Sequence, residues 1–378
     1  MIKNNNNSFS KINISILVSD EANGLDFFIG YWNPFIFFRD KFEKLGVNFK
    51  FISRLDKRAL SSDIIFLSSR FFKKVNQLVD DNYFSTFELL IKKKIKIVWF
   101  DLRDSAGTTQ FEVLPYVDLY FKKQIYRNLD TYYKDIYGGR EYSDYYHKKY
   151  KINDKDPYKY VKLTKKYEKK LNLSWNIGVK LFDSSYKNFI QRRILLSKYK
   201  FKNTFDSIYL KNSPFIKPSV RREKDFICTY SIGIPRNSVR FQRQLFKEKN
   251  IKIKNSILFE KISPSKYLDS LKKCKLILSL YGWGEVCYKE FEATVAGASF
   301  IMPNMSNILT WPNIYIPGET YLPIDWDLKN FEEIYYKLLN DNQLRLKLVN
   351  NAQKILESVH KKTGENYFES LLKKIVKK

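Results

Sequence analysis

Residues 279–298 read SLYGWGEVCYKEFEATVAGA, and this stretch carries the strongest indication of the fold. An apolar run over residues 276–280 is typical of a buried strand, and it leads through Gly282 and Gly284 into a helical pattern over residues 286–295. Glycines let the backbone approach a ligand closely, and N–H groups at the start of a helix attract phosphate. We therefore expect a strand, a glycine loop and a helix that together could hold a diphosphate.

Charged side chains in this stretch suit a nucleotide. Lys289 lies one turn into the expected helix and Glu292 follows three residues later, so both point to similar sides. A cation beside a diphosphate and a carboxylate that accepts from ribose hydroxyls is the chemistry that a nucleotide-sugar needs. The alternative is a plain strand, turn and helix with two packing glycines. The expected donor-binding residues here are Gly282, Gly284, Glu285 in the first helical turn, Tyr288, Lys289 and Glu292.

Strands alternate with helices on both sides of this stretch. Upstream, strand patterns cover residues 12–18, 47–52, 63–67 and 95–100, with helical patterns over 34–45 and 71–93. Downstream of residue 225, strands are expected at 226–231 and 251–254, helices at 238–249 and 265–273, and a strand at 299–302. Such alternation predicts parallel sheets covered on both faces. The sequence therefore predicts an α/β fold of two Rossmann-like doubly wound domains that face each other across a cleft.

The length of 378 residues also favours two domains. We expect a tail over 1–10, a Rossmann-like acceptor domain over 11–204, a Rossmann-like nucleotide-sugar domain over 205–350 and C-terminal helices over 351–378. The first domain contains a Tyr- and Lys-rich insertion at about 127–202, with a charged helical run over 161–171.

Residues 225 to 375 resemble glycosyltransferases of the two-Rossmann GT-B fold, in particular the group 1 and CgeB-like enzymes. The resemblance lies in the Gly282-Trp283-Gly284 loop, in Glu292-Ala293, in Gly297 and in the downstream segments 311–313, 319–323 and 325–327. It implies that Glu292 holds the ribose of the donor. Group 1 enzymes carry a paired glutamate where this chain has Tyr281, whereas Lys289 resembles the basic position of exostosin-like enzymes, so the resemblance leaves open whether the anomeric configuration is retained.

A second candidate segment, residues 231–240, ends a strand at a glycine turn and begins a helix. Arg236 and Arg240 lie near that helix start and could grip the diphosphate as the leaving group departs. The alternative is a solvated basic face.

The catalytic base is expected in the first half of the chain. Residues 101–109 and 20–26 each follow a strand, so their polar side chains should emerge into the cleft. Asp104 and, second, Asp26 are the candidates for the base that activates an acceptor hydroxyl. His147 is a further candidate. The alternative is that these aspartates form turns and cap helices.

No catalytic metal and no cofactor besides the nucleotide-sugar co-substrate are predicted. The Asp-x-Asp patterns at 154–156 and 325–327 do not follow the expected strands, and the three cysteines and two histidines lack metal-ligand spacing.

The formal net charge of +28 permits three anionic partners: nucleic acid, an anionic membrane surface and phosphate-bearing substrates. Nucleic acid is disfavoured because the charge is dispersed and no recognition motif is present. No apolar run approaches the roughly 18 residues of a membrane span, so we expect a cytoplasmic protein that is peripheral on the inner face of the membrane. The predicted function is transfer of a sugar from a nucleotide-sugar to a glycan or lipid-linked acceptor in surface polysaccharide synthesis. A non-catalytic sugar-nucleotide-binding protein is the alternative.

Overall fold

The computed structural model describes residues 11–18, 31–32, 34–35, 38–72, 81–179, 215–229, 232–249, 253–258, 262–359 and 361–377. Its first half builds a six-stranded sheet in the order β2-β1-β3-β4-β5-β7, with every neighbouring pair parallel. The strands are β1 (Ile12–Leu17), β2 (Val47–Ile52), β3 (Ile64–Leu67), β4 (Lys96–Asp101), β5 (Leu119–Lys122) and β7 (Leu171–Leu173).

The second half builds a five-stranded sheet in the order β13-β11-β10-β8-β9, again with parallel neighbours. Its strands are β8 (Lys224–Cys228), β9 (Ser256–Leu258), β10 (Cys274–Leu278), β11 (Ser299–Pro303) and β13 (Leu322–Ile324). In this sheet the chain moves outward from β8 to β9 and then returns past β8 to β10. The strand order therefore reverses between β8 and β10, and in the first sheet it reverses between β1 and β3. The expected α/β fold with two Rossmann-like sheets is confirmed.

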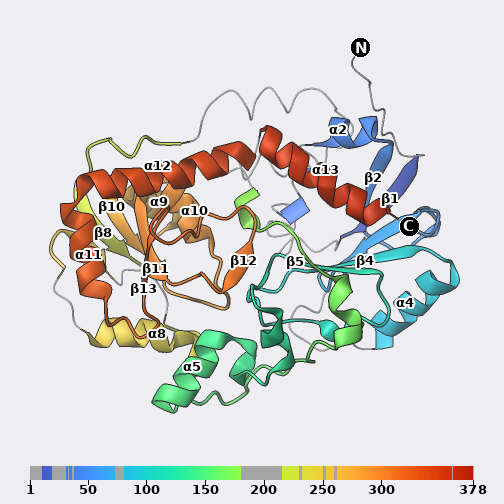
Figure 1. Cartoon of the computed structure of the whole chain (residues 1–378), viewed down its shortest axis with the longest axis horizontal. Coiled ribbons are helices and arrows are strands. Elements are labelled where there is room, and N and C mark those ends of the chain that lie inside the picture. Colours follow the sequence, from blue (N-terminus) through green and yellow to red (C-terminus); the bar gives the residue numbers. More distant parts are fainter. Residues whose placement is uncertain are drawn as a thin grey trace.

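Helices cover both sheets, and the last two link the halves (Figure 1). Helix α12 runs over the second sheet, and α13 continues across to the first. A two-stranded antiparallel pairing of β6 (Gln124–Tyr126) with β12 (Ile308–Thr310) also joins the halves. The helices are α2 (Arg39–Lys44), α3 (Lys57–Leu60), α4 (Asp81–Lys92), α5 (Glu141–Tyr150), α8 (Asn237–Glu248), α9 (Pro264–Lys273), α10 (Tyr288–Ala296), α11 (Phe331–Asn340), α12 (Asn342–Val359) and α13 (Lys362–Val376).

Two expected elements differ from the structure. Of the strand expected at 251–254, residues 251 and 252 lie outside the described residues and residues 253 and 254 are not in a strand; the strand lies at Ser256–Leu258, after a turn in which Asn255 takes φ 51°. Within the charged run at 161–171 the structure forms only a 3-10 helix, Lys165–Lys170, and this short helix has no buried residue with which a longer helix could pack. The chain then enters β7, so the Tyr- and Lys-rich segment supplies a strand of the first sheet.

Some expected boundaries cannot be compared directly with the structure. The expected junction between the domains near residue 205 lies outside the described residues, as do parts of the helical patterns at 34–45 and 71–93. The expected boundary at residue 350 falls inside α12.

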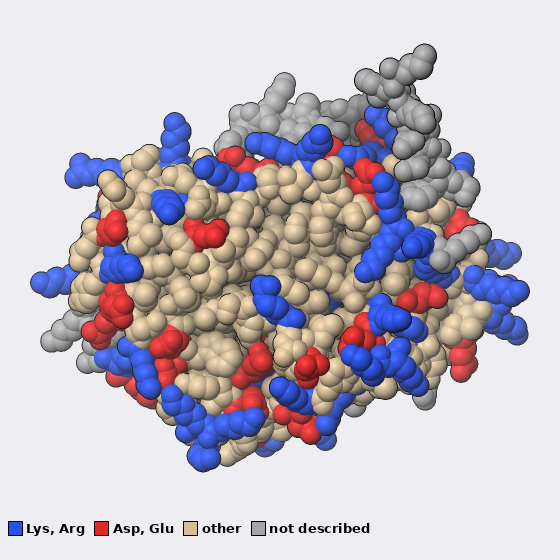
Figure 2. All heavy atoms as spheres, viewed as in Figure 1, with Lys and Arg blue, Asp and Glu red and all other residues tan. Residues whose placement is uncertain are grey.

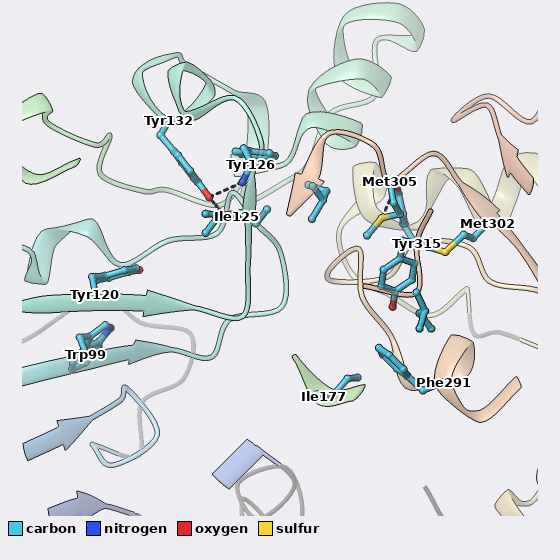
Figure 3. Packing of buried hydrophobic residues seen from close by; sticks show 14 of the residues in the cluster. Trp99, Tyr120, Ile125, Tyr126, Tyr132, Ile177, Phe291, Met302, Met305 and Tyr315 are labelled. Carbon is cyan, nitrogen blue, oxygen red and sulfur yellow. Dashed lines mark hydrogen bonds between the residues drawn. The ribbon is translucent and has the colours of Figure 1, made fainter. Parts of the chain in front are cut away.

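The main hydrophobic cluster extends through both halves. Trp99 and Tyr120 of the first sheet belong to the same buried cluster as Phe291 and Met302 of the second half. Figure 3 shows Ile125, Tyr126 and Ile177 on the path between them. The two sheets therefore share a continuous apolar core at this contact.

A separate aromatic cluster holds α13 on the first sheet. The ring of Phe368 is fully buried, and its centroid lies 5.2 Å from that of Trp175, 5.3 Å from Phe38 and 5.6 Å from Trp311. The C-terminal helix is thus packed by residues from three distant parts of the chain.

Phe368→Ala should lower the free energy of unfolding by about 3–5 kcal/mol, because it removes a buried ring and leaves a cavity. Urea unfolding measures the change. Lys374→Ala, an exposed change on the same helix, is the control and should cost at most about 0.5 kcal/mol. Equal effects of the two substitutions would contradict the packing described for α13.

Candidate functional site

Open α/β sheets bind ligands outside the carboxyl ends of their strands, at the point where the strand order reverses. Here that position lies between β8 and β10. Thr229 directly follows β8, and its carbonyl oxygen accepts a hydrogen bond from Lys289 Nζ of α10. Lys289 therefore lies at the reversal point, on the helix that follows β10.

Glu292 lies further along α10, where α9 packs against it. Burial raises the pKa of Tyr267 on α9 well above its usual value, and the negative charge of Glu292 raises it further. The Tyr267 hydroxyl is buried, and among the described residues it has no hydrogen-bond partner. A half-buried carboxylate beside an unpartnered hydroxyl suits a ligand that carries hydroxyl groups of its own.

Glu290, which the sequence analysis did not single out, fixes the start of α10. Its carboxylate accepts from the backbone N–H of Cys287 at 2.8 Å, from the Ser279 hydroxyl and from the Tyr315 hydroxyl at 3.3 Å. Burial raises its pKa to about 7, although the bonds from Ser279 and Cys287 oppose this. The sequence does contain a signal for this role, because a Glu three residues after the N-cap is typical of a capping box. This contact places the helix start at Tyr288 rather than at residue 286.

Glu285 was expected in the first turn of the helix, but it lies before α10 and faces the first half of the molecule. Its carboxylate accepts from Ser105 Oγ at 2.7 Å and from the Ala106 backbone N–H at 3.0 Å, and the residue is 4% exposed. The preceding Gly284 lies against the Asp104 backbone so closely that a Cβ would stand 1.7 Å from the Asp104 carbonyl oxygen. The glycine loop is therefore in direct contact with the loop that follows β4.

Asp104, the first candidate base, lies on this loop. Its side chain is 48% exposed, and one carboxylate oxygen is 2.9 Å from Lys123 Nζ. Burial of part of the group would raise the pKa of Asp104, but the positive charges of Lys123 and Arg70 outweigh this and lower it. A lowered pKa makes a carboxylate a weaker proton acceptor.

The structure does not place the other two candidate bases, Asp26 and His147, beside Asp104. Asp26 lies outside the described residues. His147 is on α5, where its ring stacks on Tyr137 with centroids 3.9 Å apart and its Nδ1 lies 3.1 Å from the Ile152 carbonyl oxygen.

A buried ion pair shapes the loop after β4. Asp101 and Lys122 are both fully buried, with 2.9 Å between Oδ2 and Nζ. Asp101 also accepts from the Tyr120 hydroxyl at 2.6 Å and from the Arg103 backbone N–H at 2.9 Å. Burial lowers the pKa of Lys122, and the attraction to Asp101 opposes that change. Removing one partner of such a pair leaves an uncompensated buried charge, so the loop is strongly constrained.

Arg236 and Arg240 lie at the start of α8, as expected. Arg236 occupies the N-cap position, and the Nε of Arg240 is buried without a hydrogen-bond partner among the described residues. The helix start itself is capped by Asp154, whose carboxylate accepts from the Ser238 N–H at 2.8 Å and the Ser238 hydroxyl at 2.6 Å. One Asp-x-Asp pattern thus contributes a cap.

The other Asp-x-Asp pattern also contributes a structural contact. Asp327 accepts from Lys149 at 2.7 Å and from the Tyr145 hydroxyl at 3.1 Å. Although burial opposes it, these bonds lower the pKa of Asp327 to about 2. Within the part of the chain that the structure describes, no group of three or more His, Cys, Asp or Glu side chains is arranged to hold a metal ion.

The segment around α5 bridges to the second half, where α5 packs on α8 (Figure 1). The Tyr142 hydroxyl donates to the Gly282 carbonyl at 2.9 Å, and Arg140 Nε donates to the Trp283 carbonyl at 2.9 Å. The glycine loop is therefore held from two sides, by the loop after β4 and by α5.

No protein-family model matches the chain, and no curated protein matches it. Similar solved structures include a glycosyltransferase from Rickettsia africae, with 9% identity over 98% of this chain and 100% of that chain and a TM-score of 0.45. A UDP-GlcNAc 2-epimerase from Neisseria meningitidis bound to UDP-GlcNAc has 12% identity over 96% of this chain and 100% of that chain, with a TM-score of 0.39. MnaA of S. aureus with UDP has 10% identity over 97% of this chain and 98% of that chain, with a TM-score of 0.38. The fold assignment rests on the two parallel sheets of this chain.

Gly284→Ala should destabilise the protein by about 3 kcal/mol or more, because the added Cβ would overlap the Asp104 carbonyl and separate the two loops. Gly282→Ala is the matched control, because the nearest atom to its Cβ is the end of the flexible Arg243 side chain, 3.0 Å away. Thermal unfolding compares the two. An equal loss of stability in both variants would show that the loop contact is not tight.

Proposed function

We propose that this chain is a glycosyltransferase that moves a sugar from a nucleotide-sugar donor to a glycan or lipid-linked acceptor in surface polysaccharide synthesis. The observation that carries the proposal is the position of Lys289 where the strand order of the second sheet reverses, beside Glu292 on the same helix. A cation there can hold the diphosphate, and a carboxylate can accept from the ribose hydroxyls.

In the proposed reaction, the bond between the anomeric carbon and the diphosphate breaks while the acceptor hydroxyl oxygen bonds to that carbon. The positive charges of Lys289 and of Arg240 on α8 stabilise the leaving diphosphate. The hydroxyl proton goes to a carboxylate of the first half, for which Asp104 is the described candidate. The apolar contact between the halves restricts water near the donor, which favours transfer over hydrolysis.

Surface charge favours this proposal over nucleic-acid binding. Figure 2 shows Lys and Arg interspersed with Asp and Glu on the face in view, without one continuous basic stripe. Within the described residues, no helix combines the length and apolar character that crossing a bilayer requires. The proposed function includes peripheral contact of the protein with an anionic membrane surface, because a lipid-linked acceptor resides there.

A non-catalytic sugar-nucleotide-binding protein remains the second candidate, because Asp104 is paired with Lys123. Release of nucleoside diphosphate from the donor in the presence of acceptor separates an enzyme from a binding protein. Thermal-shift measurements with UDP, GDP, CDP and their sugars identify the donor, because a ligand of the folded state raises its melting temperature.

Glu292→Gln should weaken binding of that nucleotide-sugar by about tenfold or more and leave the fold intact, because a charged hydrogen-bond acceptor is lost with little change in volume. Calorimetric titration measures the affinity. Glu248→Gln, an exposed change at the far end of α8, is the control and should bind like the unmodified chain. Identical titrations for Glu292→Gln and the unmodified chain would remove Glu292 from the donor site.

Sugar transfer should survive EDTA, because Lys289 and the arginines at the start of α8 can neutralise the leaving diphosphate. The measurement is nucleoside diphosphate release before and after chelation. Activity that is lost with EDTA and returns with Mn²⁺ or Mg²⁺ would overturn the metal-independent scheme.

A further inference from the structure

Three arginine side chains surround one tyrosine ring where the two halves meet. The guanidinium carbons of Arg103, Arg236 and Arg140 lie 5.3, 5.7 and 5.9 Å from the centroid of Tyr158. They come from the loop after β4, the N-cap of α8 and the N-cap of α5. Three separate elements thus bring a guanidinium group to the same ring, and we call these arginines with Tyr158 the arginine cluster.

The carboxylates around the cluster are mostly engaged elsewhere. Asp101 is bonded to Lys122, Asp104 to Lys123, and Asp154 to Ser238 of α8. Among the described residues, the one carboxylate within ion-pair distance of Arg236 is that of Asp156, at 3.9 Å and with its side chain 85% exposed. Within the described part of the chain, Arg236 therefore has only one exposed carboxylate to balance its charge.

The position of Arg236 has an energetic cost. Burial lowers the pKa of Arg236, and repulsion from Arg140 lowers it further, while Asp156 and Asp154 oppose the change. Two guanidinium groups that repel each other, as Arg236 and Arg140 do, are stabilised when an anion joins them. The arrangement is thus suited to receive a negatively charged group.

A phosphoryl group fits the cluster best. Planar guanidinium forks match the oxygens of a phosphate in pairs, and ring contacts fix the planes of the arginines. Trp283 adds a second ring, 5.6 Å from Arg236 and 5.8 Å from Arg140, and it is 38% exposed. An aromatic face at the edge of an anion site can also contact the body of a ligand.

Successive residues of the glycine loop contact the cluster and α8. The Trp283 carbonyl accepts from Arg140, on the cluster side. One residue earlier, Gly282 lies against Arg243 of α8, which itself donates to the Tyr281 carbonyl at 3.2 Å. Two of the three arginines, and Tyr158, belong to the first half of the chain, which is the acceptor side in the proposed function.

We propose that Arg103, Arg140 and Arg236 bind a phosphoryl group of the acceptor, so that the acceptor is a phosphate-bearing glycan or lipid and not a neutral sugar. The identification of this ligand as the acceptor rests on the proposed function. It gives Arg236 a role different from the expected one at the donor diphosphate, and the two roles are separable by competition.

The test uses sn-glycerol 3-phosphate as a simple phosphate ester and the full chain at constant ionic strength. Calorimetric titration is performed without nucleotide and with a saturating amount of the nucleoside diphosphate that raises the melting temperature. We expect binding in both titrations with the same affinity within about twofold. Arg236→Gln should weaken it about tenfold or more, because hydrogen bonds to charged groups are lost.

Arg221→Gln is the matched control, because it removes the same charge from an exposed position at the opposite end of β8 and should bind like the unmodified chain. Among the described residues, the Arg236 side chain has only the 3.9 Å ion pair with Asp156 besides its two ring contacts, so its replacement should preserve the fold, which circular dichroism verifies.

Three outcomes would overturn the proposal: no binding of the phosphate ester, unchanged binding by Arg236→Gln, or loss of binding in the presence of nucleotide. Loss of binding in the presence of nucleotide would indicate that the arginines bind the donor diphosphate instead. If no nucleotide binds while phosphate binding still depends on Arg236, the phosphate site is supported and the proposed function alone fails.

Discussion

The buried carboxylate of Glu285 is the constraint on which the arrangement of the two halves depends. A carboxylate that is withdrawn from water must be hydrogen-bonded, and the bonds come from Ser105 and Ala106 of the other half. These groups can approach only because Gly284 has no side chain where the Asp104 backbone passes. Separation of the halves would leave a charged group without its partners, so the contact favours one relative position.

This contact links the chemistry of the two halves. The buried pair of Asp101 and Lys122 holds the loop after β4, and that loop holds Glu285. Three residues after Glu285, α10 begins and carries Lys289 to the reversal point of the second sheet. The position of the proposed phosphate-binding lysine therefore depends on contacts that begin at an ion pair in the other half, so substitutions near Asp101 should also affect the proposed donor site.

Local sequence patterns predicted the parts of the structure that local physics decides. Apolar runs identified the central strands, and the glycine loop with its helix was placed to within a few residues. The pattern could not show which distant groups meet: Asp154 capping α8 through Ser238, or α13 crossing to the first sheet through Phe368. Arg236 illustrates the difference, because its position at a helix start was predictable but its neighbours Arg103 and Arg140 depend on tertiary packing.

Three glutamates within eight residues show how one short segment divides its carboxylates among different tasks. Glu285 precedes the helix and bonds to the other half, whereas Glu290 and Glu292 lie on α10 and are separated by about 200° around its axis, at roughly 100° per residue. That rotation turns Glu290 inward, where burial raises its pKa to about 7, and leaves Glu292 half-buried beside Tyr267 of α9. Glu285 and Glu290 are buried and bonded within the protein, whereas Glu292 is only half-buried, and for this reason the proposed donor site uses Glu292.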